Sequence, residues 1–202
     1  MTGDGASEFD AIWDEAKDCT NQGDYDKAMD IYKYILVRYA DNPKAVEYAN
    51  ACLGDVLLTS RKRLDLAETH LKKAIAAAQD NHHYHYLLGL VYSVREQWPE
   101  ATLSLEKALA LSPNDSEYER CLGWALFNGG SEIEGLDHLN SALESAPTDV
   151  HIMTDLGTAM LILRDITMAR QYAEDALQID PTYDLAKRLA ETIERTERKP
   201  NS

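Results

Sequence analysis

The feature that most constrains the fold of this chain is a repeat with a period of 34 residues. Leu-Gly pairs occur at Leu88-Gly89, Leu122-Gly123 and Leu156-Gly157. The same spacing separates Ala101, Gly135 and Ala169, then Ala108, Ala142 and Ala176, and finally Pro113, Pro147 and Pro181. A period of about 20 to 50 residues is typical of repeat arrays, in which each repeat buries its apolar face against its neighbours.

The repeat extends toward the N-terminus with two changes of phase. Leu53-Gly54 lies 35 residues before Leu88-Gly89, so the repeat that begins near Glu47 contains one extra residue. The segment Gly23-x-Tyr25-x-x-Ala28 fits the middle of one more repeat, which requires a second insertion near Tyr39. The sequence therefore predicts five repeats, at 9–46, 47–81, 82–115, 116–149 and 150–183, after a flexible N-terminal tail at 1–8.

Each repeat carries apolar and small residues at helical spacing on both sides of a short polar turn, which predicts two amphipathic helices. In the third repeat these helices are expected at about 82–94 and 98–111. Ser131-x-x-Glu134 predicts a capping box at the start of the second helix of the fourth repeat. The sequence therefore predicts an all-α fold without strands.

Close packing between the two helices of a repeat explains the small-residue columns. Gly54, Gly89, Gly123 and Gly157 lack a side chain where the first helix of a repeat is expected to meet the second. Such a pair cannot bury its apolar face alone, so the last repeat needs a cover. We expect an amphipathic capping helix at 184–198, with Leu185, Leu189 and Ile193 on its apolar face, and a short tail at 199–202.

Composition narrows the classes of partner. The chain has 20 basic and 35 acidic residues, and its net charge of −15 repels phosphate backbones and anionic lipids. No apolar run approaches the length of about 20 residues that a membrane span needs. The first residues also lack the basic start of a secretory signal. We expect a cytoplasmic protein that neither binds nucleic acid nor inserts into membranes, with Cys19, Cys52 and Cys121 reduced.

The repeats resemble those of the tetratricopeptide repeat family over about 9–183. The resemblance is carried by Leu88-Gly-x-x-Tyr92, Trp98-x-x-Ala101, Gly23-x-Tyr25-x-x-Ala28, and Leu105-x-x-Ala108 followed by Pro113. It implies a right-handed superhelical solenoid of helix-turn-helix repeats. It also implies a non-enzymatic scaffold or adaptor, in which the first helix of each repeat lines a concave groove that binds a peptide or helical segment of another protein.

The resemblance further implies which residues face that groove. The expected peptide-binding residues are Trp13, Lys17, Asn21, Tyr48, Asp55, Tyr86, Leu90, Arg120, Trp124, Asn128 and Asp155. The same faces carry Asp10, Cys52, Thr59, Leu87, Val94, Glu117, His151, Thr158 and Leu161.

The chemistry of this lining predicts a class of ligand. Family members that hold the carboxyl terminus of heat-shock chaperones use a clamp of Lys, Asn and Arg, but here Lys17 is the only groove lysine of the first three repeats. What remains is an aromatic and aliphatic strip edged by acids, which favours an apolar, net-basic segment. Trp13, Tyr86 and Trp124 are the expected anchors. Aromatic residues at helical spacing can instead belong to the core, and this alternative stays open.

No catalytic motif accompanies these residues, so we expect neither enzymatic activity nor a cofactor. His82, His83 and His85 form the one histidine cluster, but an exposed, polar helix start explains it, and we expect no metal site. The run Arg61-Lys62-Arg63 is interpreted as a solvated turn in preference to a docking loop for an acidic partner.

One alternative function remains open at this point. The chain could be a self-assembling structural protein that forms a homodimer through its terminal helices, and the groove would then be incidental.

Overall fold

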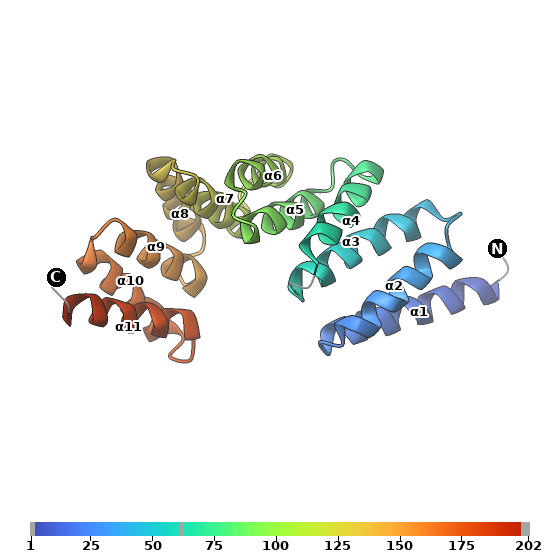
Figure 1. The fold of residues 1–202 in the computed structure, drawn as a ribbon, viewed down its shortest axis with the longest axis horizontal. Coiled ribbons are helices and arrows are strands. Elements are labelled where there is room, and N and C mark those ends of the chain that lie inside the picture. The colour runs from blue at the N-terminus through green and yellow to red at the C-terminus, as the bar shows by residue number, and fades with distance from the viewer. Residues whose placement is uncertain (1–2, 61–62, 199–202) are drawn as a thin grey trace. The chain divides into compact units, whose positions relative to one another are not determined.

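The computed structural model describes residues 3–60 and 63–198, and within them every regular element is a helix (Figure 1). The helices are α1 (Gly3–Asn21), α2 (Tyr25–Arg38), α3 (Pro43–Thr59), α4 (Leu64–Ala77), α5 (His82–Val94), α6 (Trp98–Leu111), α7 (Ser116–Asn128), α8 (Glu132–Ser145), α9 (Val150–Ile162), α10 (Ile166–Ile179) and α11 (Asp184–Arg198). The all-α fold class expected from the repeats is therefore confirmed.

The chain divides into an N-terminal unit that ends at Leu111, with α1 to α6, and a C-terminal unit that begins at Ser112, with α7 to α11. Inside each unit every helix packs against the next along the chain. In addition, α3 contacts α5 in the N-terminal unit, while α9 contacts both α7 and α11 in the C-terminal unit. First helices of successive repeats therefore lie side by side within a unit and can share one surface.

The last three helix pairs fall within the repeats read from the sequence, whereas α1 and α3 begin before the expected starts of the first two repeats, at residues 9 and 47. In the third repeat, α5 and α6 occupy the two predicted ranges, and α11 occupies the range expected for a capping helix. The tail expected at 199–202 lies outside the described residues. At the N-terminus, α1 already begins at Gly3, inside the segment expected to be a tail. The ring of Phe9 stacks on Trp13 and meets the edge of Tyr39, so this part of α1 is tied to the end of α2.

The glycines mark places where two helices approach closely. A Cβ atom on Gly89 would lie 2.6 Å from Cγ of Leu105, across the contact of α5 with α6. The contact of α7 with α8 is tighter, because Gly123 faces Gly135 there. A Cβ on Gly135 would lie 2.5 Å from the backbone nitrogen of Phe127. This backbone-to-backbone approach explains why the column of Ala101 and Ala169 carries a glycine at 135.

The predicted capping box at Ser131 is wrong. Its side chain makes no hydrogen bond to the start of α8. Asp24 and Asp165 cap α2 and α10 with similar backbone angles, and each accepts a hydrogen bond from an amide of its helix. A carboxylate oxygen is one bond further from the backbone than a serine hydroxyl, so aspartate reaches the amide from this backbone conformation and Ser131 does not.

Few polar side chains are buried among the helices, and Glu47 is one of them. Only 5% of Glu47 is exposed. The hydroxyl of Tyr84 donates to its Oε1 over 3.1 Å, and the ammonium of Lys44 donates to its Oε2 over 2.9 Å. The Glu47 carboxylate therefore links α3 to α5, and it neutralises the charge of Lys44.

The remaining sequence expectations concern cysteines, membranes and a basic run. Cys19 and Cys121 are buried, Cys52 is partly buried, and all three are free thiols. None of the helices among the described residues combines the length and apolarity needed to cross a bilayer. Within the basic run, Arg61 and Lys62 lie outside the described residues, while Arg63 pairs with Asp65.

We predict that Gly135→Ala destabilises the protein by about 1–3 kcal/mol, because its new methyl group meets backbone atoms that cannot move separately. Gly89→Ala is the matched control, since its methyl group meets mainly the flexible side chain of Leu105. Urea unfolding followed by circular dichroism measures both. Equal losses of unfolding free energy in the two variants would contradict this explanation of the glycine column.

Candidate functional site

Three of the cavities formed by the described residues are lined by first helices of the repeats. The first, the Trp13 cavity, lies between α1 and α3 and has a volume of about 420 Å³. Its lining residues are Phe9, Trp13, Asn42, Lys44, Ala45 and Tyr48. The Trp13 ring also meets the edge of the buried Tyr32, at 5.7 Å between ring centroids. Trp13 therefore belongs both to the packing of the N-terminal unit and to the wall of a cavity.

The second cavity, the Asp55 cavity, lies between α3 and α5 and has a volume of about 290 Å³. Its lining residues are Tyr48, Ala51, Cys52, Asp55, Asn81, His83, Tyr84 and Leu87. Tyr48 is 45% exposed and lines both cavities of this unit. Burial raises the pKa of Asp55 above its ordinary value, which indicates a carboxylate that is partly withdrawn from water.

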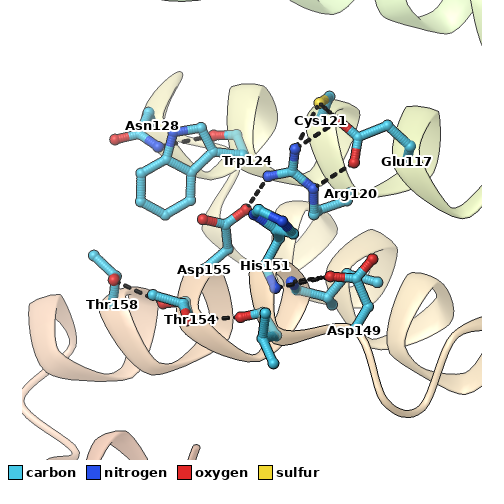
Figure 2. A network of polar contacts seen from close by, with 12 residues as sticks. Glu117, Arg120, Cys121, Trp124, Asn128, Asp149, His151, Thr154, Asp155 and Thr158 are labelled. Atoms are coloured by element: carbon cyan, nitrogen blue, oxygen red, sulfur yellow. Dashed lines mark hydrogen bonds and ion pairs between the residues drawn. The ribbon is translucent and has the colours of Figure 1, made fainter. Parts of the chain in front are cut away.

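The third cavity, the Trp124 cavity, lies in the C-terminal unit and has a volume of about 290 Å³. Its lining residues are Trp124, Thr154, Asp155, Thr158, Leu161, Leu185, Arg188, Leu189 and Thr192. The indole of Trp124 stacks on Phe127, at 6.2 Å between centroids. The Asn128 amide donates to the carbonyl of Trp124 over 2.8 Å, which fixes Asn128 at the end of α7 (Figure 2).

The contribution of α11 to the Trp124 cavity is not among the sequence predictions. Leu185 was expected on the buried face with Leu189 and Ile193, but it is 52% exposed. The fully buried Ala186 takes that place instead. The signal for this arrangement was present in the sequence, because Leu185 lies 34 residues after the groove position His151. Extending the period by one step would have assigned α11 as a further first helix.

Arg120 is the centre of an ion-pair network that joins α7 to α9 (Figure 2). Its guanidinium donates to both carboxylate oxygens of Glu117, over 2.8 and 2.7 Å, and also to Asp155. The side chains of Arg120 and Asp155 are 18% and 22% exposed. Two residues expected to contact a ligand are therefore paired with each other, and neither presents a free charge.

The other predicted contact residues are spread over both units. Lys17 and Asn21 are exposed on α1. Tyr86 and Leu90 are partly buried on α5 and lie outside the three cavities described above. The structure thus places Trp13, Tyr48 and Asp55 around adjoining cavities of the N-terminal unit, and it places Trp124 and Asp155 around the cavity of the C-terminal unit.

Groups that could support chemistry are few. The Nε2 atom of His85 lies 2.8 Å from the carbonyl oxygen of Gln79. Across residues 3–60 and 63–198, no three or more His, Cys, Asp or Glu side chains are grouped to hold a metal ion. Burial raises the pKa of Cys52 to about 11, so its thiol stays protonated and weakly nucleophilic at neutral pH.

Comparison with known proteins identifies similar chains. Residues 53–116 match the family model described as tetratricopeptide repeat. The human protein O-mannosyl-transferase TMTC1 is 26% identical over 186 residues, which cover 89% of this chain. The chain spans 20% of the length of that relative.

Solved structures show the same fold. TTC0263, a thermophilic TPR protein of Thermus thermophilus, superposes with a TM-score of 0.74 at 17% identity, over 91% of this chain and 98% of that one. YrrB, described as a TPR protein with an unusual peptide-binding site, gives a TM-score of 0.65 at 23% identity, over 87% of this chain and 88% of that one. This fold serves protein–protein interaction in general, and proteins that carry it are generally non-enzymatic. Residues 53–116 thus match the tetratricopeptide repeat family, and the whole chain shares with tetratricopeptide repeat proteins the fold of repeated helix pairs.

Proposed function

We propose that the protein is a non-enzymatic scaffold, adaptor-like or chaperone-like, which binds an apolar, net-basic peptide or helix of another protein. The Trp124 cavity is the observation that carries this proposal, since it combines an indole with Leu161 and the half-exposed Leu185. The cavity has a volume of about 290 Å³, at the lower end of the range of about 300–1,000 Å³ for small-molecule sites, and it has room for one apolar side chain. A partner segment that inserts an apolar anchor there would gain most of its binding energy from that contact.

Charge supports the net-basic character of the partner. Residues 112–202 carry 17 acidic and 8 basic residues, a net charge of −9. Such a field attracts basic segments and raises the rate of their association. Arg120 does not oppose this attraction locally, because Glu117 and Asp155 already neutralise it.

YrrB supports the proposal by analogy. YrrB has an unusual peptide-binding site, and its chain has a similar fold and a similar length. The analogy favours a peptide ligand for this chain as well. The residues that line the three cavities of this chain would determine the sequence of that peptide.

A second candidate is self-assembly through the terminal helix α11. It is favoured by Leu185, a large apolar side chain that is 52% exposed on that helix. A copy of the chain that covered Leu185 would bury this surface in a homodimer, and it would block the Trp124 cavity at the same time.

We predict that Trp124→Ala weakens the binding of peptides selected from a random phage-displayed library by about tenfold or more, because the variant lacks the cavity's aromatic wall. Isothermal titration calorimetry measures the affinity. Ile133→Ala is the control, since Ile133 is 80% exposed on α8 and lines none of the three cavities. Unchanged affinity in Trp124→Ala, with its fold intact by circular dichroism, would overturn the placement of the anchor.

We also predict that the association rate constant of such peptides falls as the salt concentration rises, while the dissociation rate constant changes little. Salt screens the attraction between the acidic protein and a basic segment during encounter. Stopped-flow fluorescence with a labelled peptide separates the two rate constants. An association rate that is independent of salt would contradict the net-basic character of the ligand.

The two candidate functions predict different oligomeric states. A binding scaffold is expected to be monomeric at micromolar concentration, with the Trp124 cavity open. Light scattering coupled to size exclusion measures this directly. A dimer that Leu185→Asp converts to a monomer would favour self-assembly over the scaffold.

A further inference from the structure

We propose that the Asp55 cavity is the subsite that receives one long basic side chain, lysine or arginine, of the partner segment. This inference rests on the proposed function and adds a specific contact to it. It assigns the basic character of the ligand to one position in the N-terminal unit, between α3 and α5.

Among the acids expected to meet a basic partner, Asp55 is the one placed in a cavity without a cation. Glu117 and Asp155 already share the guanidinium of Arg120. Asp55 accepts a hydrogen bond from the hydroxyl of Thr59 over 3.5 Å, and no Lys or Arg among residues 3–60 and 63–198 pairs with it. Its charge is therefore available to a ligand.

The neighbours of the cavity do not neutralise Asp55. Burial lowers the pKa of His83 below its ordinary value of 6.5, so this imidazole, which lines the same cavity, is neutral at pH 7. Lys44 lies 5.5 Å from the ring of Tyr48 at the cavity wall, but its ammonium pairs with Glu47 over 2.9 Å. An unpaired carboxylate that is partly withdrawn from water is costly, and a cation from the partner would offset that cost.

The walls of the cavity suit the rest of a long basic side chain. Ala51 and Leu87 offer apolar surface to its methylene groups, and Asp55 offers a carboxylate to its cationic end. The volume of about 290 Å³ leaves room for one such side chain. A short acidic or amide side chain would leave Asp55 without a cation, so charge complementarity selects lysine or arginine.

Small cations test the subsite without any peptide. We would titrate n-butylguanidinium and n-butylammonium into the full chain and follow the NMR signals of the His83 and Tyr48 rings, with n-butanol as the neutral comparator. Saturable shifts are expected in the wild type and in Glu106→Gln, a control that removes one exposed carboxylate from α6. Asp55→Asn is expected to abolish them. Equal shifts in Asp55→Asn, or none in the wild type, would overturn the subsite.

Peptides from the phage-displayed library test the same contact in its proposed setting. Asp55→Asn is expected to weaken a basic peptide about tenfold, and replacing one lysine or arginine of that peptide by glutamine should have the same effect. The two changes together should cost little more than either alone. If no peptide binds the wild type, the proposed function fails. If peptides bind but Asp55→Asn changes neither their affinity nor their preference for a basic residue, the proposed function stands and the subsite is wrong.

Discussion

The structure depends on the close approach of the two helices in each repeat. Gly89 lets the backbone of α5 come within contact of Leu105, and Gly123 and Gly135 bring α7 and α8 together backbone to backbone. A helix pair packed this tightly presents one apolar face to the next pair, so the repeats stack within each unit. The first helices then lie side by side, and their outward faces form the walls of the three cavities.

In this arrangement, some side chains that pack the helices together also line a cavity. Trp13 meets the edge of the buried Tyr32 and also lines a cavity, so one side chain serves both. Arg120, in contrast, lies at a position expected to face the groove, but it does not offer its charge to a ligand. Its guanidinium pairs with Asp155 and so joins α7 to α9. Among the described residues, the chemistry that the cavities offer a ligand therefore includes apolar anchors around Trp124 and the carboxylate of Asp55, which has no Lys or Arg partner.

The repeat pattern made the helix pairs predictable. The small residues that recur at one position of each repeat all lie where two helices approach closely. The all-α fold, the helices of the third repeat and the extent of α11 could all be read from such spacings. The capping box at Ser131 could not, since it depends on whether a hydroxyl reaches an amide from one particular backbone conformation. The pairing of Arg120 with Asp155 joins residues of different repeats, and a pattern within one repeat does not reveal it. The role of Leu185 does not follow from the amphipathic pattern of α11 alone, but it does follow from the repeat period, because Leu185 lies 34 residues after His151 of α9.

The most direct measurement is a crystal structure of the full chain with a peptide selected for binding. A peptide bound to the C-terminal unit should place an apolar side chain in the cavity walled by Trp124 and Leu185, and a peptide bound to the N-terminal unit should place a lysine or arginine against Asp55. A peptide bound instead along the second helices α2, α4, α6, α8 or α10, with all three cavities empty, would contradict this mode of binding.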